Sequence, residues 1–268
     1  MAQNHARVSL QPGFVLHTRP YRNTSLIAEA FTPDFGIVAL VARGARRRQS
    51  RLRGLIQPFR PLLLSWSGRG ELMTLTGAED DGAPLWFRGY ALASAFYLNE
   101  LLLRLLHRHD AHAELFFHYR DALRHLVKMN TAVGTDPGPS LQRLLRIYEK
   151  YLLTALGFGL TLDREAHGGA PIRAEMQYHY YHDAGPVPAD RDGAGSAVTV
   201  TVSGRTLLAL ANDELNEPGV LKEAKQLLRR LLEAHLGGKP LGSRALIEVY
   251  RGDARSAAAA PMKAPVNH

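Results

Sequence analysis

The sequence predicts an α+β protein in which a small β-barrel is followed by a mostly helical domain. Five short apolar segments separated by turn signals fill residues 13–78. After Pro84 the apolar residues switch to a spacing of three and four, which is typical of buried helices. We expect a barrel at 1–82, a helical domain at 83–251 with a β-containing insert at about 158–202, and a disordered tail at 252–268.

The expected strands cover residues 13–21, 24–31, 37–43, 58–66 and 71–78. They are rich in β-branched and aromatic residues, and Leu62, Leu64 and Trp66 alternate with Leu63 and Ser65. Five short strands in under about 80 residues favour a small closed barrel, of which the nucleic-acid-binding OB-fold is the best-known example.

The expected helices cover residues 87–108, 114–129, 140–157, 204–212 and 218–236. Ser140 is expected as the N-cap of the third helix and Gly157 as its end, whereas Pro218 suits the first turn of the last helix. Between these helices, MQYHYYHD and AVTVTVS predict short strands in the insert.

The most distinctive feature is a run of cations without acidic neighbours. No Asp or Glu occurs between Asp34 and Glu71. The same stretch holds the arginines Arg43, Arg46, Arg47, Arg48, Arg51, Arg53, Arg60 and Arg69. Guanidinium groups stay charged and grip phosphate oxygens in a planar fork, so the block predicts a polyanion-binding surface. The alternative is a solvent-exposed loop whose charges only keep it soluble.

In a barrel this block joins the third and fourth strands, and neighbouring residues extend it. The expected DNA-binding set is Arg19, Arg22, Arg43, Arg46, Arg47, Arg48, Arg51, Arg53 and Arg69. The aromatic residues Tyr21, Phe35, Phe59 and Trp66 are candidates for base stacking, although the alternation of Phe35 and Phe59 favours core positions for those two.

Composition narrows the function class. The formal net charge of +8 would attract nucleic acid or an anionic surface. Because the chain has no cysteine, disulfides, thiol catalysis and thiolate metal sites are excluded. It also has no long apolar run and no signal-peptide pattern, so we expect a cytoplasmic protein without a membrane partner.

The histidines invite a metal hypothesis, because His167, His179, His182 and Asp183 lie in one loop-rich segment. In an extended segment, however, residues three apart point to opposite sheet faces, so His179 and His182 cannot easily share an ion. We therefore expect no metal site and no cofactor.

Signatures of catalysis are also weak. Glu79, Asp80 and Asp81 sit at a turn without a partner carboxylate at a useful spacing, and the chain has neither a Walker loop nor a nucleophile elbow. We expect a binding protein rather than an enzyme.

Arg143 and Arg146 share a predicted helix with many leucines. Cations beside an apolar groove are what an acidic peptide with hydrophobic anchors requires. Simple surface charge is the alternative interpretation.

Several longer motifs occur together and in order between Phe14 and Tyr250. They are VLHTRPYRNTSLIAEAFTPDFG, VARGARRR, LIQPFRPLLLSW, GRGELMTL, YLNELLLRLL, ALGFGL and LGGKPLGSRAL. With these motifs the chain resembles the RecO family of bacterial DNA repair and recombination mediators. The resemblance implies an N-terminal OB-fold, a helical C-terminal domain and an insert in which many relatives carry four zinc-binding cysteines. This chain has none, so zinc is not carried over.

The resemblance also implies a function. Members of the family bind single- and double-stranded DNA, anneal complementary strands coated with single-stranded DNA-binding protein, and with RecR help load RecA. None of this requires breaking a covalent bond. The family also docks the acidic C-terminal tail of single-stranded DNA-binding protein. We expect Arg146 to pair with that tail, with Arg143 as a second cation and Leu145 and Tyr148 as apolar anchors.

Two alternatives remain open from the sequence. One is another OB-fold module that acts on RNA. The other is a metal-assisted hydrolase that uses the histidine-containing insert.

Overall fold

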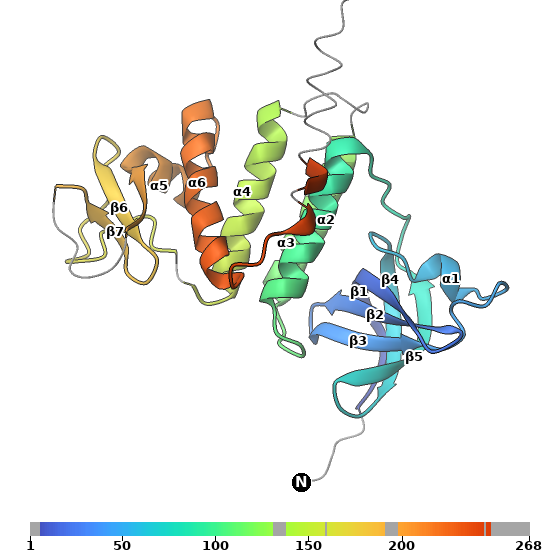
Figure 1. Ribbon diagram of the computed structural model, residues 1–268. Coiled ribbons are helices and arrows are strands. Elements are labelled where there is room, and N and C mark those ends of the chain that lie inside the picture. Colours follow the sequence, from blue (N-terminus) through green and yellow to red (C-terminus); the bar gives the residue numbers. More distant parts are fainter. Residues whose placement is uncertain (1–5, 131–137, 159, 191–197, 244, 248–268) are drawn as a thin grey trace, which may run out of the picture.

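A computed structural model describes residues 6–130, 138–158, 160–190, 198–243 and 245–247 (Figure 1). A barrel formed by the N-terminal strands lies at one end of the molecule, helices form the middle, and a small sheet lies at the other end. The expected succession of a barrel, a helical region and a small β-containing region is confirmed.

The five barrel strands close in the order β1-β2-β3-β5-β4. Their bounds are β1 Ala6–Tyr21, β2 Ser25–Thr32, β3 Gly36–Ala42, β4 Pro61–Gly68 and β5 Leu72–Asp80. β3 and β5 run parallel, with Val41 opposite Thr74, and the other neighbours are antiparallel. A short helix, α1 (Leu52–Leu55), lies between β3 and β4. This is an OB-like barrel.

Two local features of the barrel differ from the expectation. β1 begins at Ala6 rather than at residue 13. Its first part, up to Phe14, pairs with β4, and the part from Phe14 onward pairs with β2. The helix α1 was not predicted, since a single turn of four residues has no apolar periodicity to reveal it.

Alternation along β1 divides its side chains between two cores. Val15 points into the barrel, where it joins a core that includes Leu64 and Trp66. Phe14 and Leu16 point the other way and join the core of the helical region. The pleat of one strand therefore supplies both hydrophobic clusters.

Three long helices, α3, α4 and α6, lie roughly side by side in Figure 1, and the small sheet lies beyond α6. The helices are α2 Gly89–Leu105, α3 Ala113–Lys128, α4 Gly138–Ala155, α5 Gly204–Ala211 and α6 Pro218–His235. The sheet has the order β7-β6-β8, from β6 Gln177–Tyr181, β7 Gly185–Pro188 and β8 Val198–Ser203.

The helix ends test the capping predictions. Pro218 opens α6 as expected. Gly157 follows α4 with a positive φ of 77°, and its N–H donates to the carbonyl of Thr154, as a C-terminal glycine does. The prediction that Ser140 is the N-cap of α4 is wrong, because the helix already begins at Gly138.

An aromatic cluster joins the barrel to the helices. Phe14 and Phe31 of the barrel meet Phe116 and Tyr119 of α3, with ring centroids 5.5–5.9 Å apart and mostly edge-to-face. Such pairs stabilise beyond the area they bury. The barrel is thus packed directly against α3.

Polar contacts fix the same junction. The buried amide of Asn99 on α2 donates from Nδ2 to the carbonyl of Leu16 at 2.9 Å, and its Oδ1 accepts from the hydroxyl of Tyr119 at 2.6 Å. The backbones of the barrel and the helical region also approach each other closely at Gly36, where a Cβ would lie 1.9 Å from the carbonyl oxygen of Asp110. The two parts are therefore held in one orientation.

No helix in the described ranges is both long enough and apolar enough to cross a bilayer.

We predict that Asn99→Ala lowers the free energy of unfolding by about 2–4 kcal/mol, because it leaves a buried carbonyl and a buried hydroxyl unpaired. Tyr119→Phe removes only one of these bonds and should cost less. Urea denaturation monitored by circular dichroism measures both variants. Equal stability of Asn99→Ala and the wild type would show that the amide does not hold the junction.

Candidate nucleic-acid interface and partner pocket

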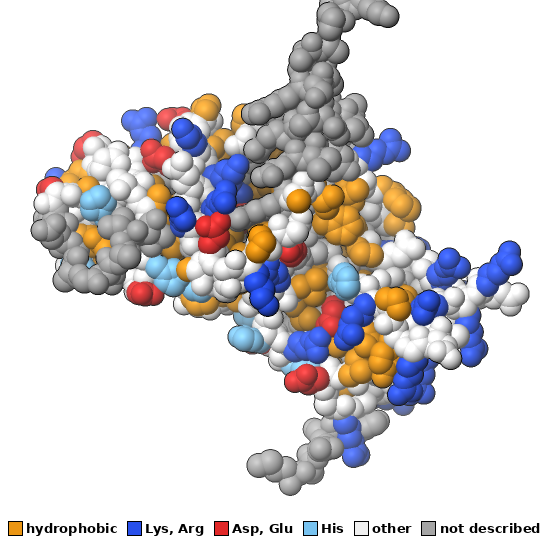
Figure 2. All heavy atoms as spheres, viewed as in Figure 1, with side chains coloured by type: hydrophobic (Ala, Val, Ile, Leu, Met, Phe, Trp, Pro, Cys, Tyr) orange, Lys and Arg blue, Asp and Glu red, His pale blue; other side chains and the backbone are white. Residues whose placement is uncertain are grey.

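All nine arginines of the expected DNA-binding set are exposed. Arg19 and Arg22 lie on β1 and the turn after it, and Arg69 lies in the turn between β4 and β5. Five of the other six lie between the end of β3 and α1, and Arg53 lies on α1. In Figure 2, Lys and Arg side chains gather over this edge of the barrel.

The segment after β3 turns its arginines outward for a local reason. Ala45 and Ile56 are buried in the barrel core, at 0% and 3% exposure, and so anchor the segment at both ends. Between them the backbone forms tight turns, such as the one closed by the bond from Ser50 N–H to the carbonyl of Arg47 at 3.0 Å. Leu52 and Leu55 in this segment pack against the barrel core, whereas its arginine side chains are exposed to solvent.

None of these nine guanidinium groups forms an ion pair with a carboxylate in the part of the chain that the structure describes. Arg46 instead reaches the backbone carbonyls of Arg22 and Asn23, both at 3.4 Å. Arg60 behaves differently, since it forms a two-pronged bond with Asp80, which holds the pKa of that carboxyl below its usual range. The nine arginines therefore keep their charge unneutralised.

A polar pocket of about 530 Å³ opens among these residues. Its lining is Tyr21, Arg22, Thr24, Ser25, Val41, Arg43, Gly44, Arg47 and Thr74. Hydroxyls and guanidiniums around one concavity are the groups that proteins use to hold phosphate oxygens. Arg19 and Arg69 are exposed but are not part of this lining.

The four aromatic candidates for base stacking differ in their burial. Trp66 is 1% exposed and packs in the barrel core, so the prediction that it stacks on bases is wrong. Phe59 is buried and Phe35 packs against Trp66, as their alternation indicated. Tyr21 alone among the four lines the polar pocket, where the guanidinium of Arg22 lies 5.2 Å from its ring centroid.

The expected role of Arg146 requires a correction. Its side chain is buried and forms an ion pair with Glu149, which also accepts a 2.7 Å hydrogen bond from the hydroxyl of Tyr97. Leu145 is buried as well. Because its guanidinium is occupied in the interior, Arg146 is not available to an acidic partner in this structure.

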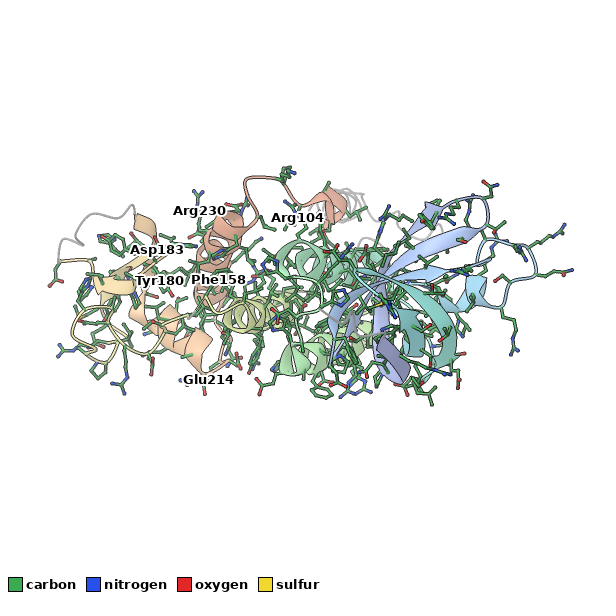
Figure 3. All side chains as sticks on the ribbon, turned by 90° about the horizontal axis from the view of Figure 1, so that it is seen from below. Arg104, Phe158, Tyr180, Asp183, Glu214 and Arg230 are labelled. Carbon is green, nitrogen blue, oxygen red and sulfur yellow. The ribbon has the colours of Figure 1, made fainter. Side chains whose placement is uncertain are left out.

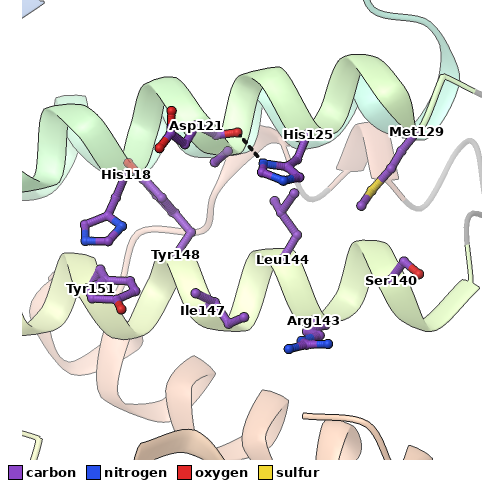
Figure 4. Close-up of a pocket in the computed structure, with 11 residues that line it drawn as sticks. His118, Asp121, His125, Met129, Ser140, Arg143, Leu144, Ile147, Tyr148 and Tyr151 are labelled. Atoms are coloured by element: carbon purple, nitrogen blue, oxygen red, sulfur yellow. Dashed lines mark hydrogen bonds between the residues drawn. The ribbon is translucent and has the colours of Figure 1, made fainter. Parts of the chain in front are cut away.

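A different site on α4 combines one arginine with an apolar surface. A pocket of about 440 Å³ lies between α3 and α4 and includes Arg143 and Tyr148 from the expected set (Figure 4). Its lining is His118, Asp121, Ala122, His125, Met129, Ser140, Arg143, Leu144, Ile147, Tyr148 and Tyr151. Arg143 is exposed at its rim and donates to the carbonyl of Asp213 at 2.9 Å and to Oδ1 of Asn216 at 3.1 Å.

Comparisons with known proteins agree with this architecture. The family model described as "Recombination protein O N terminal" matches residues 7–80, and "Recombination protein O C terminal" matches residues 87–245. The chain belongs to the RecO family.

Relatives of similar length carry the same name. A protein of Nitrosococcus oceani named "DNA repair protein RecO" is 48% identical over 91% of this chain and 95% of its own length. Proteins of the same name from Thiobacillus denitrificans and Alkalilimnicola ehrlichii are 47% and 46% identical, covering 90% and 98% of this chain and 92% and 98% of their own lengths. The family supports a role as a recombination mediator in DNA repair.

The described histidines of this RecO-family chain do not gather as a metal site would require. Within the described residues, no group of three or more potential ligands converges. His179 bonds to the hydroxyl of Thr201, whereas Nε2 of His182 lies 3.0 Å from Nε2 of His235 on α6. Asp183 lies beside His182, and Figure 3 shows Asp183 on the small-sheet side of α6.

Sequence reasoning missed the pairing of His182 with His235, because the two residues are 53 positions apart and only the packing of α6 on the sheet brings them together. The stacking of Phe158 on His235, with centroids 3.4 Å apart, helps to bury the pair.

We predict that protein stability falls as the pH is lowered through 6.5. Burial and the neighbouring His182 lower the pKa of His235 below its ordinary value of 6.5, so the unfolded state takes up the proton first. His118 has a lowered pKa as well. To isolate the contribution of His235, the free energy of unfolding of wild type and of His235→Gln is measured by urea denaturation above and below pH 6.5. An unchanged pH dependence in the variant would contradict the assignment.

Proposed function

We propose that this RecO-family protein binds single- and double-stranded DNA by its phosphates, on the barrel edge formed by the nine exposed arginines. The observation that carries this proposal is that these guanidiniums are exposed and have no carboxylate partner in the described part of the chain. Bound phosphates would supply the missing counter-charge and release condensed cations, which favours binding without regard to sequence.

Strand annealing follows from this mode of binding. Two complementary strands repel each other through their backbones, and a surface that neutralises both lowers that repulsion. Contacts to phosphates leave the base edges free to pair. We therefore propose that the protein anneals complementary strands and that it breaks no covalent bond in doing so. The ion pair between Arg60 and Asp80 supports the proposal that no covalent bond is broken. It leaves one of the three carboxylates at residues 79–81 unavailable for metal-assisted chemistry.

The proposal includes the partners expected from the family. With RecR, the protein would help load RecA onto DNA coated by single-stranded DNA-binding protein, in the cytoplasm. Membership of the RecO family and the shared name of its relatives as DNA repair proteins support this role.

The acidic tail of single-stranded DNA-binding protein would dock in the pocket between α3 and α4 rather than on Arg146. Leu144, Ile147 and Met129 offer an apolar surface for hydrophobic anchors. Arg143 at the rim uses two neutral oxygen acceptors, so its full charge can attract carboxylates. Charge beside an apolar groove is the combination that such a peptide needs.

We predict that changing Arg46, Arg47 and Arg48 together to alanine weakens DNA binding for every sequence. The slope of log affinity against log salt should flatten by about 0.7 for each lost single-strand contact. Fluorescence anisotropy with labelled DNA across a salt series measures both effects.

A matched control removes three exposed cations from α6, by changing Lys222, Arg229 and Arg230 to alanine. Equal losses in the two triple variants would reduce the effect to net charge and contradict the site. Tighter binding of RNA than of DNA of matched length would favour an RNA-binding function instead.

We predict that Leu144→Glu reduces binding of a synthetic acidic tail peptide by about tenfold or more, because it places a carboxylate against an acidic ligand. Affinity for naked DNA should stay unchanged. Leu208→Glu, at a similarly half-buried leucine of α5 outside the pocket, is the control. If the peptide binds both variants equally, it does not dock between α3 and α4.

A further inference from the structure

The connection between β5 and α2 presents an indole to solvent. Trp86 is 74% exposed, more than any other large hydrophobic residue among those described. The chain has two tryptophans, and the other, Trp66, is 1% exposed in the barrel core. Exposing so large an apolar ring forfeits the stabilisation that its burial would give.

The backbone that carries Trp86 is fixed on both sides. Nδ2 of Asn130 donates to the carbonyl of Trp86 at 2.6 Å, and Oδ1 of the same amide accepts from the N–H of Arg88 at 3.0 Å. The neighbouring Phe87 is buried, with its ring 5.1 Å from that of Phe59. The indole therefore projects from a rigid support, and a ligand that stacks on it would lose little chain entropy in ordering it.

The surroundings of Trp86 are mainly cationic. Arg88, whose N–H donates to Asn130, and Lys128, two residues before Asn130, are both exposed, and neither forms an ion pair within the described residues. Asp81 is the nearby exposed carboxylate of the same connection, while Asp80 is neutralised by Arg60. A partner that is flat, apolar on its faces and negatively charged along its backbone fits this combination.

The connection is also continuous with the arginine-bearing edge of the barrel. The N–H of Leu85 donates to the carbonyl of Phe59 at 3.1 Å. Arg60, which follows Phe59 in the chain, donates from its guanidinium to the carbonyl of Gly54 at 2.8 Å. Gly54 belongs to α1, beside Arg53. In Figure 1 the connection leaves the barrel near α1 and β4. A strand held along α1 can therefore reach the indole.

We propose that Trp86 is a stacking platform for a nucleobase of single-stranded DNA whose phosphates the barrel arginines hold. This inference rests on the proposed DNA-binding function and adds a preference to it. In a duplex each base is already stacked on its neighbours, whereas an unpaired base offers a free face. Stacking on one aromatic residue strengthens binding by about 5- to 150-fold. Trp86 would therefore strengthen binding to single strands relative to duplexes. Contacts to phosphates alone do not provide this preference, because they do not touch the bases.

The test compares Trp86→Ala with Trp86→Phe on an oligothymidine strand and on a duplex of equal length. Trp86→Ala should weaken single-strand binding by about 5- to 150-fold, change duplex binding less than about twofold, and be largely rescued by Trp86→Phe, which keeps an aromatic face. Phe117→Ala is the matched control, because Phe117 is also an exposed aromatic, 46% exposed on α3.

Intrinsic fluorescence gives a second readout. Stacking of thymine on Trp86 should quench the emission of the wild type, and the quenching should vanish in Trp86→Phe, in which the buried Trp66 is the remaining reporter. The proposal is overturned if Trp86→Ala binds single strands as tightly as wild type, loses strand and duplex affinity equally, or matches Phe117→Ala.

These outcomes separate this proposal from the proposed function. If the variant of Arg46, Arg47 and Arg48 loses DNA affinity while Trp86→Ala does not, DNA binding by the barrel stands and the stacking platform fails. If the arginine variant binds DNA normally, the barrel-edge assignment itself fails.

Discussion

The arginines after β3 are held outward by two buried neighbours, Ala45 and Ile56, and no described carboxylate offsets their charge. Guanidiniums cannot release their protons at any working pH, so this surface stays cationic. The repulsion among six arginines on one short segment is a cost that the free protein carries. A polyanion removes that cost, which is why the interpretation of the whole molecule depends on these side chains.

The junction between the barrel and the helices gives this surface a fixed relation to the rest of the chain. Phe14 and Phe31 pack against α3, and Asn99 joins α2 to β1 by a buried hydrogen bond. The cationic edge lies on the barrel, whereas the pocket lined by Arg143 and Leu144 lies between α3 and α4. Because the junction fixes these two surfaces apart from each other, the proposed DNA-binding edge and the proposed tail pocket would be separate sites on one molecule.

Much of the fold could be predicted from the sequence, because alternation and three-to-four spacing report burial directly. The strands, the long helices and the exposure of the arginine block follow from such local patterns. The side chain partners could not be predicted. Arg146 and Glu149 look like a surface pair by spacing, yet tertiary packing buries both. Trp66 and Trp86 are equally good stacking candidates by residue type, and only the structure shows that Trp66 is buried in the barrel and Trp86 is exposed in the connection to α2.

The most direct measurement of the central claim is the salt dependence of wild-type affinity for single strands of different sequence. If phosphates on the barrel arginines supply the binding energy, log affinity should fall linearly with log salt, with a slope of about 0.7 for each phosphate contact, and the slope should be the same for oligothymidine, oligocytidine and mixed sequence. A slope near zero, or one that changes strongly with base sequence, would contradict the account.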